Sequence, residues 1–164
     1  MKLKILNTEL LKHISENYSY DPDSGLLYYN GIKTGSLSSS GYLYCTILNE
    51  NLSVHRVCWY LYYNEFPNHS IDHVDRVKTN NKIINLRKCN QAQNLANRTK
   101  MKPGTSSFKG VYFIKKQNKY CARISFNNKR IYLGLFNNEL DAAEVYNKKA
   151  KELYGDFAIN DITL

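Results

Sequence analysis

The sequence has no acidic residue between positions 76 and 138, although that stretch holds fifteen Lys and Arg residues. The flanking segments are mildly acidic, with eight acidic against five basic residues in 1–75 and six against three in 139–164. A long run without carboxylates concentrates positive potential, which attracts polyanions through steering and counterion release. The net charge of +9 is therefore localised and favours nucleic acid as the partner.

Other features are equally scarce. No apolar run approaches the roughly 20 residues of a membrane-spanning helix, and no strongly basic amphipathic helix is evident, so no membrane partner is expected. The four cysteines are irregularly spaced and form no C-x-x-C pair, which argues against a disulfide framework or cysteine-ligated zinc. Reduced thiols and an N-terminus without a long apolar segment lead us to expect a cytoplasmic protein.

Residues 1–98 predict one domain in which short strands lead into a strand, loop, strand and helix unit. Alternation of apolar and polar residues over 42–48 predicts a half-buried strand. Helical spacing of the apolar residues that follow predicts a helix ending before Pro67. Strands at 70–74 and 83–89 and a short helix at 91–98 complete the domain.

A second domain, residues 108–164, is predicted beyond a linker. Residues 99–107 combine Pro, Gly, Ser and Thr and are expected to be flexible. Strands at 111–114, 120–126 and 130–135 predict a three-stranded antiparallel sheet, and an amphipathic helix after them would cover one face. The expected fold class is therefore α+β, with an N-terminal β-rich region and a three-stranded sheet packed on one helix.

Period-two alternation divides that sheet into two faces. The packed face would hold Ala122, Ile124, Phe126, Ile131, Leu133 and Leu135. The outer face would carry Cys121, Arg123, Ser125, Arg130 and Tyr132, with Lys109 and Tyr112 beside them and Lys115, Lys116, Lys119 and Lys129 at the rim. Arginine reads guanine edges, whereas lysine and tyrosine more often hold phosphate, so this face predicts a DNA-binding surface.

Asp72 and His73 bring together two groups that phosphodiester hydrolysis requires. A histidine near its ordinary pKa can take a proton from water. A divalent cation can stabilise the added negative charge, and Mg²⁺ prefers oxygen ligands such as Asp72 and Asn94 offer. Adjacent strand residues point to opposite faces, so a bend or strand end is expected at this dipeptide.

These residues resemble the HNH (ββα-metal) nucleases of the phage and intron-associated homing kind. In that pattern Asp-His is followed by Asn after twelve residues and by another motif residue nine further on, and His73, Asn85 and Asn94 reproduce both intervals. The resemblance implies that His73 is the general base and that Asn85 braces the loop holding it. It implies Asp72 and Asn94 as ligands of one Mg²⁺ or Mn²⁺ per site, with Asn94 a weaker ligand than the more usual histidine.

The resemblance extends upstream to Tyr20-Asp21-Pro22, Gly35, Gly41-Tyr42, Val54-His55-Arg56 and Trp59. His55 is interpreted as a packing or hydrogen-bonding residue, with a catalytic role as the alternative. Arg56 either contacts phosphate or stabilises the local fold, and the predicted DNA contacts include Arg56, Arg87 and Arg98. His13 and His69 lie in no comparable constellation and are interpreted as surface residues.

Residues 108–161 resemble the plant Apetala-two/ethylene-response DNA-binding domain, which phages also attach to HNH nucleases. The matching residues are Phe108-Lys109-Gly110-Val111-Tyr112, Tyr120-Cys121-Ala122-Arg123-Ile124, Tyr132-Leu133-Gly134-Leu135-Phe136, Ala142-Ala143 and Tyr146. The resemblance implies a sheet that enters the DNA major groove with a helix behind it. Tyr112 and Ser125 stand where plant members often have arginine, so plant target sequences do not carry over.

Three functions are open at this stage. The first is a metal-dependent endonuclease, phage- or intron-encoded and acting in the host cytoplasm, that hydrolyses or nicks double-stranded DNA. The second is a non-catalytic, sequence-specific DNA-binding protein with a degenerate nuclease fold, and the third is an RNA-binding module. The intact Asp72-His73 pair favours the first. The sequence specifies neither the DNA target nor whether the protein is a monomer or a dimer.

Overall fold

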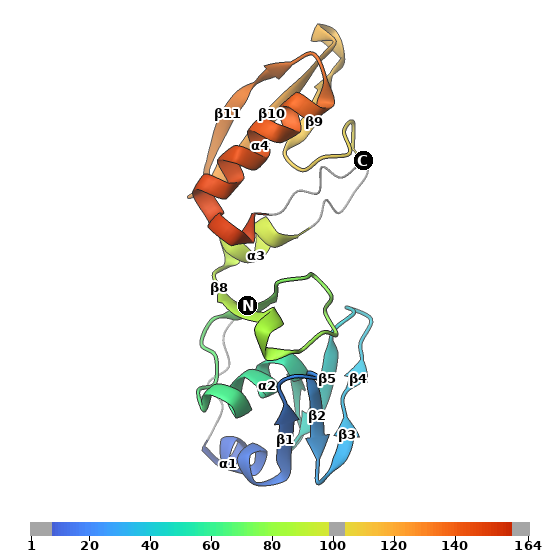
Figure 1. Ribbon diagram of the computed structural model, residues 1–164, viewed down its shortest axis with the longest axis vertical. Helices are drawn as coiled ribbons and strands as arrows, with labels where there is room; N and C mark the ends of the chain where they lie inside the picture. Colours follow the sequence, from blue (N-terminus) through green and yellow to red (C-terminus); the bar gives the residue numbers. More distant parts are fainter. Residues whose placement is uncertain (1–7, 99–103, 159–164) are drawn as a thin grey trace. The chain divides into compact units, whose positions relative to one another are not determined.

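The computed structural model describes residues 8–98 and 104–158, which belong to two compact units, 1–90 and 91–164. Helices and small antiparallel sheets occur in the described residues of both units, so the fold is α+β (Figure 1). The division falls after Asn90, whereas a linker was predicted at 99–107. No helix among the described residues is long and apolar enough to cross a bilayer.

The N-terminal unit contains two three-stranded antiparallel sheets, two helices and a strand pair. Helix α1 (Thr8–Asn17) precedes the sheet β1-β2-β3 (Tyr18–Asp21, Leu26–Tyr29, Ile32–Thr34). The sheet β4-β5-β6 (Ser36–Leu37, Leu43–Ile47, Glu50–Ser53) leads into helix α2 (Val54–Tyr63). Strand β7 (Ser70–His73) then pairs with β8 (Leu86–Cys89). The predicted strand at 42–48 and helix before Pro67 are thus confirmed.

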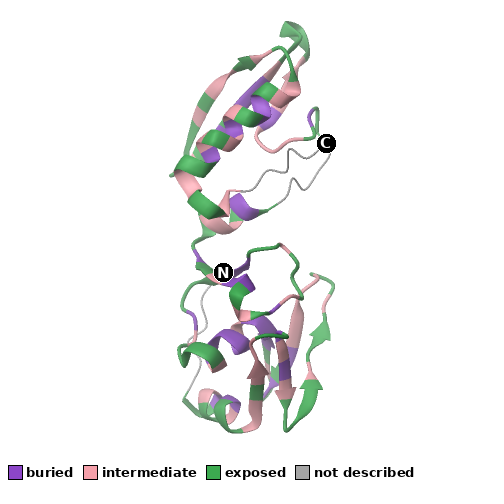
Figure 2. Ribbon diagram, viewed as in Figure 1, coloured by how far each residue is buried: buried purple, intermediate pink, exposed green. Residues whose placement is uncertain are grey.

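Helix α2 provides the centre of the N-terminal core, visible as buried residues along its ribbon in Figure 2. It packs against β1, β5, β6 and α1. In helix α1, Leu10 and Ile14 stand four residues apart on one face and are both buried in this core. Burial of an apolar face stabilises a short helix beyond its intrinsic propensity.

The strand predicted at 83–89 begins only at Leu86. Residues Ile83–Asn85 form a 3₁₀ turn, and only Leu86–Cys89 pair with β7. The turn is fixed by the backbone N–H of Ile83, which donates to the Pro22 carbonyl at 3.1 Å and is therefore not available to a ladder. Strand β7 ends at His73, where the sequence predicts a strand end.

The C-terminal unit begins with α3 (Gln91–Asn97), which contacts helix α4 (Glu139–Tyr154). Strands β9 (Val111–Ile114), β10 (Lys119–Phe126) and β11 (Lys129–Phe136) form an antiparallel sheet in the order β11-β10-β9. Helix α4 covers one face of this sheet (Figure 1). The three predicted strands and the amphipathic helix are confirmed.

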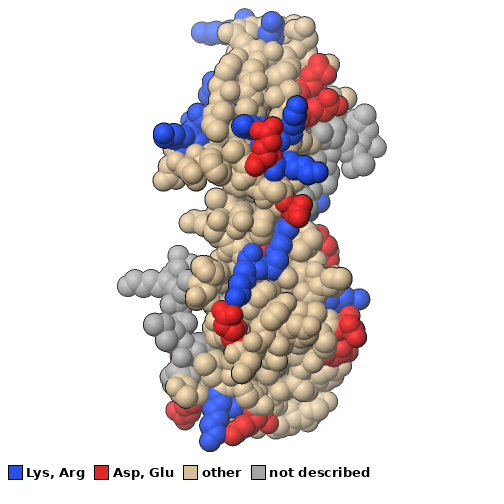
Figure 3. Space-filling view, turned by 60° about the vertical axis from the view of Figure 1, so that its left-hand side comes forward, with Lys and Arg blue, Asp and Glu red and all other residues tan. Residues whose placement is uncertain are grey.

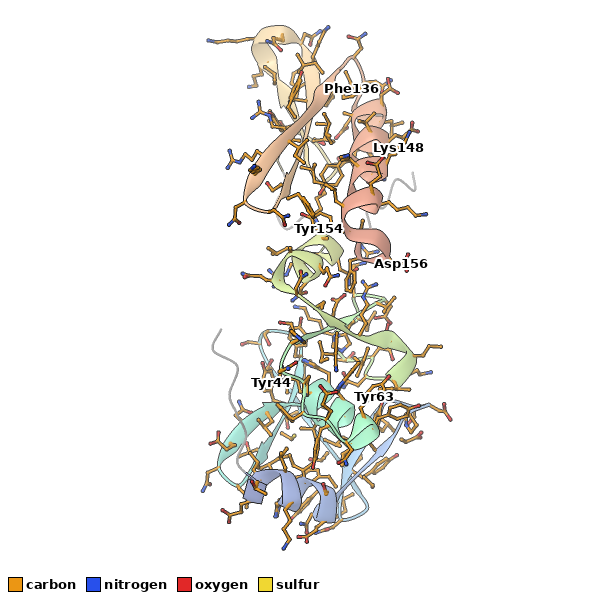
Figure 4. All side chains as sticks on the ribbon, turned by 90° about the vertical axis from the view of Figure 1, so that its left-hand side faces the viewer. Tyr44, Tyr63, Phe136, Lys148, Tyr154 and Asp156 are labelled. Atoms are coloured by element: carbon orange, nitrogen blue, oxygen red, sulfur yellow. The ribbon has the colours of Figure 1, made fainter. Side chains whose placement is uncertain are left out.

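A bulge in β11 changes which residues face the helix. Ala122 pairs with Gly134 but Arg123 pairs with Tyr132, so one extra residue lies in β11 at this point. Beyond the bulge the alternation is inverted. Phe136 therefore packs on the helix side (Figure 4), and Leu135, predicted to pack there, is 36% exposed. Cys121, on the outer face, is buried between its cross-strand neighbours Tyr112 and Leu135.

The end of the predicted linker is part of the C-terminal unit. Residues 99–103 lie outside the described ranges, but residues just beyond them make specific hydrogen bonds. Thr105 Oγ1 accepts from the Phe113 backbone N–H at 2.8 Å, and Ser107 N–H donates to Glu139 Oε1. A polar composition alone does not distinguish such a segment from a flexible one, because the distinction depends on distant partners.

Gly110 provides a test of the packing in this unit. It has a φ of +73°, and a Cβ built there would lie 2.0 Å from the Tyr146 ring and 2.7 Å from the Arg123 carbonyl oxygen. We predict that Gly110→Ala lowers the free energy of unfolding of the C-terminal unit by about 2–5 kcal/mol, combining overpacking with positive-φ strain. The measurement is amide hydrogen exchange of β10 under native conditions.

The matched control is Gly155→Ala, which introduces the same methyl group in the same unit. Gly155 also has a positive φ, +57°, but a Cβ added there would have no neighbouring atom within 4 Å. It should cost only the backbone part, roughly 1–2 kcal/mol. Equal losses in the two variants would contradict the close packing of Gly110 against Tyr146.

Candidate functional site

His73, the last residue of β7, is 4% exposed, and its ring is hydrogen-bonded. Its Nε2 lies 2.9 Å from Oδ1 of Asn81, in the loop between β7 and β8. Burial lowers the pKa of His73 from its usual value, although the Asn81 hydrogen bond and the nearby Asp72 carboxylate oppose this. The ring is therefore neutral near pH 7, as a proton acceptor must be.

A second histidine lies against the first. His55, in the first turn of α2, has its ring centroid 5.1 Å from that of His73 in an edge-to-face arrangement. The Tyr42 ring lies 5.4 Å from His55 and 5.8 Å from His73. Burial lowers the pKa of His55 to about 3, with smaller contributions from His73 and Arg56. His55 is thus an uncharged residue that packs against His73. Its sequence context did not indicate this contact.

Asp72 lies in an ion pair with its cross-strand neighbour Arg87. Oδ2 of Asp72 is 3.0 Å from both Nε and Nη2 of Arg87, and the two side chains are 8% and 17% exposed. Asp72 therefore faces Arg87 while the adjacent His73 faces His55, as alternation along a strand requires. Arg87 was predicted to contact DNA, but in the structure its guanidinium is committed to Asp72.

Asn85 braces the loop that follows His73. Its Oδ1 accepts from the backbone N–H of Asp75 at 2.9 Å. Its Nδ2 donates to Oδ1 of Asp75 at 2.8 Å and to the Asn80 carbonyl at 2.7 Å. The Asp75 carboxylate also accepts from Val77 N–H and from Asn80 Nδ2. This network spans the loop from both ends, which is the geometry of the bracing role implied for Asn85.

The donors proposed for a metal are divided between the units. Asp72 belongs to the N-terminal unit, whereas Asn94 lies on α3 in the C-terminal unit. Within the described residues, no group of three or more His, Cys, Asp or Glu side chains could hold a metal ion. Asp72 and Asn94 each offer the type of oxygen ligand that a hard cation prefers.

Two other cations predicted to contact DNA are bonded to backbone carbonyls. Arg56 donates to the Pro67 carbonyl at 2.6 Å and to the His69 carbonyl at 3.1 Å, so it stabilises the loop after α2. Nζ of Lys109 donates to the carbonyls of Leu95, Ala96 and Arg98 and thereby caps the C-terminal end of α3. Arg98 itself is exposed.

The outer face of the β9–β11 sheet carries the remaining predicted contacts. Arg123 is paired with Tyr132, and Ser125 with Arg130, across β10 and β11, and all four are exposed. The Arg123 guanidinium lies over the Tyr112 ring at 5.1 Å. Gly110, Val111, Tyr112, Arg123, Ser125 and Arg130 line a shallow open hollow. Lys and Arg side chains project from this unit in Figure 3.

Comparison with known proteins connects the N-terminal site to a nuclease family. Residues 53–96 match a protein-family model described as HNH endonuclease, so the matched segment includes His55, Asp72, His73, Asn85 and Asn94. An uncharacterised HNH endonuclease of Acanthamoeba polyphaga mimivirus is 38% identical over 88 residues, which cover 54% of this chain and 44% of the relative. The chain thus spans less than half of that relative. No solved structure matches the chain.

The family match ends at residue 96 and does not reach the segment that resembles Apetala-two domains. The resemblance to Apetala-two domains stays a prediction, and the structure shows only that this segment contains three strands and a helix. The ββα-metal arrangement of β7, β8 and α3 likewise stays a prediction, because α3 belongs to the other unit.

The bracing network makes a stability prediction. We expect Asn85→Ala to lower the free energy of unfolding of the N-terminal unit by about 1–3 kcal/mol, because it removes three hydrogen bonds made by a buried side chain. Urea unfolding followed by the fluorescence of Trp59, the single tryptophan, reports on this unit. The control is Asn68→Ala, which truncates an exposed asparagine in the same unit. Identical unfolding midpoints for the two variants would refute the brace.

Proposed function

We propose that this protein is a metal-dependent HNH-type endonuclease that hydrolyses or nicks phosphodiester bonds of double-stranded DNA. The observation that carries the proposal is the buried, hydrogen-bonded imidazole of His73, which ends a strand inside the segment matching an HNH endonuclease model. A homing-type role belongs to the same proposal and rests on the spacing of His73, Asn85 and Asn94. A cytoplasmic place of action is also proposed, and it rests on the unpaired cysteines and on the absence of a long apolar segment at the N-terminus of the sequence.

In this proposal His73 takes a proton from water as the water oxygen attacks phosphorus. A positioned general base of this kind contributes about 10²–10⁴-fold to the rate. Asn85 contributes by keeping the loop after His73 in place, because misplacement of the base lowers the rate steeply. Asp72 and Asn94 would hold Mg²⁺ or Mn²⁺, which supplies Lewis-acid stabilisation of the charge developing on the phosphate.

The DNA partner is supported by the distribution of charge. Residues 76–138 contain fifteen basic and no acidic residues, and two of the basic ones, Arg123 and Arg130, are exposed on one face of a sheet. We propose that this face binds the DNA backbone. Ser125, which lines the same hollow, adds an exposed hydroxyl, whereas the hydroxyl of Tyr112 is buried.

One observation favours the second candidate, a DNA-binding protein that does not cut. Asp72, the charged ligand of the proposed cation, is held by Arg87, and a carboxylate paired in this way offers a weaker metal site. That protein would bind DNA with a strong salt dependence and without any metal requirement. Cleavage assays with a matched histidine variant separate the two functions.

We predict that wild-type protein with Mg²⁺ or Mn²⁺ cuts or nicks duplex DNA and that His73→Ala lowers the rate by about 10²–10⁴-fold. His69→Ala is the control, because His69 is an exposed histidine in the same unit. Chelation by EDTA should stop cleavage, and added Mg²⁺ should restore it. The assay follows plasmid and genomic DNA by gel. If wild type and His73→Ala are equally inert while both bind DNA, the non-catalytic function is correct.

We also predict that the double variant Arg123→Ala/Arg130→Ala binds duplex DNA more weakly. Removing two phosphate contacts should reduce the slope of log K against log salt by about 2. The control is Lys148→Ala/Lys151→Ala, which removes the same charge from α4, the helix on the other face of the sheet (Figure 4). Fluorescence anisotropy over a salt series measures both quantities. An equal loss in the control would show that only net charge matters.

A further inference from the structure

Asn81 contacts His73, the proposed general base, and occupies none of the motif positions. Its side chain is 1% exposed, and its Oδ1 is the partner of His73 Nε2 at 2.9 Å. An amide oxygen only accepts hydrogen bonds, so Nε2 of a neutral His73 must carry the proton in this arrangement. The lone pair of the imidazole then resides on Nδ1.

We propose that Asn81 is a positioning residue for DNA hydrolysis, which selects the His73 tautomer with the proton on Nε2 and the lone pair on Nδ1. This inference rests on the proposed nuclease function. Water gives one proton to Nδ1, its oxygen forms a bond to phosphorus, the bond from phosphorus to the leaving oxygen breaks, and that oxygen takes a proton from solvent. The imidazolium formed keeps its Nε2–H hydrogen bond to Asn81, and the neighbouring dipole stabilises the charge.

The opposite orientation of the Asn81 amide would disable the base. Nδ2 of Asn81 would then donate to Nε2 of His73, which would place the ring proton on Nδ1 and leave no nitrogen to accept one from water. In that orientation Oδ1 would occupy the buried position where Nδ2 lies now. At this position Nδ2 has no hydrogen-bond partner. The tautomer of His73 and the orientation of the Asn81 amide thus determine each other. An NMR spectrum of the His73 ring nitrogens therefore reports on both.

The N-terminal hairpin holds the backbone of Asn81. The Tyr20 hydroxyl, at the end of β1, donates to the Asn81 carbonyl at 2.6 Å. In the turn after β1, Gly25 has a φ of +76°, and a Cβ there would lie 2.5 Å from Lys82 N and 2.7 Å from the Asn81 carbonyl carbon. The hairpin turn and the loop are therefore in direct backbone contact. Residues far outside the 53–96 match thus fix the residue that orients His73.

Ring-nitrogen NMR tests the orientation without any cleavage. In protein labelled with ¹⁵N-histidine at pH 8, we expect His73, assigned by its loss in His73→Ala, to show a protonated Nε2 with a slowly exchanging proton. Asn81→Leu should lose that protected proton, whereas Asn81→Asp keeps an acceptor oxygen and should retain it. A wild-type His73 protonated on Nδ1, or a protected proton that survives in Asn81→Leu, would overturn the inference.

Kinetics test whether the orientation matters for the reaction. We expect Asn81→Leu to lower kcat about 10–100-fold with little change in KM, the size of effect seen when a partner orienting a histidine is removed. Asn81→Asp should recover much of the rate. Tyr20→Phe should give a smaller loss, and Tyr28→Phe, a matched change on β2 of the same hairpin, should give none.

The outcomes separate the two proposals. A folded Asn81→Leu with unchanged kcat would overturn the positioning role while cleavage by wild type upholds the nuclease. Absence of cleavage in every protein, wild type included, would overturn the nuclease function and the kinetic role together, whereas the NMR result still decides the orientation. If Asn81→Leu does not fold, equal kcat values for Tyr20→Phe and Tyr28→Phe would contradict the inference.

Discussion

The hydrogen bonds between Asp75, Asn80 and Asn85 hold the loop from β7 to β8 in one conformation, although that loop contains little regular structure. His73 is the residue before this loop begins and Asn81 lies at its far end, so their contact at 2.9 Å depends on the loop keeping its shape. Asn85 is the buried member of this network, and a buried amide is costly when its hydrogen bonds are not made. The site is therefore rigid for a reason that lies in amides and one carboxylate rather than in apolar packing.

The pair formed by Asp72 and Arg87 acts on the same strands in a different way. Because the two residues are cross-strand partners, their attraction favours the observed register of β7 and β8. A buried ion pair adds little net stability, but losing one partner leaves an uncompensated charge and costs several kcal/mol. Asp72 thus has a structural function whether or not it binds a cation, and a weak, substrate-assisted metal site is consistent with a carboxylate that already has a cationic partner.

Periodicity in the sequence predicted most of the elements, and it failed where a distant partner decides the outcome. The alternation at 42–48 and the helical spacing after it correspond to β5 and α2. The bulge that turns Phe136 inward and Leu135 outward leaves no sign in a period-two pattern. At the site, motif spacing drew attention to His73 and Asn85. The contact of His55 with His73 could not be predicted in this way, because it joins two separate elements, α2 and β7. Asn81 could not be singled out either, because it is one of several asparagines in its loop. Lys109 was predicted from its charge, which does not reveal that its ammonium caps a helix.

The hydrophobic core of the N-terminal unit runs from Leu10 to Leu86 and so crosses the boundary of the family-matched segment at residue 53. The segment that carries the recognisable chemistry is therefore only part of the segment that forms the core. Helix α1 and two small sheets, which lie before residue 53 or end at it, complete this core. Grafting residues 53–96 onto another protein would transfer His73 without the tyrosine and the turn that contact Asn81, so a graft needs residues 8–90 as well as Asn94 on α3.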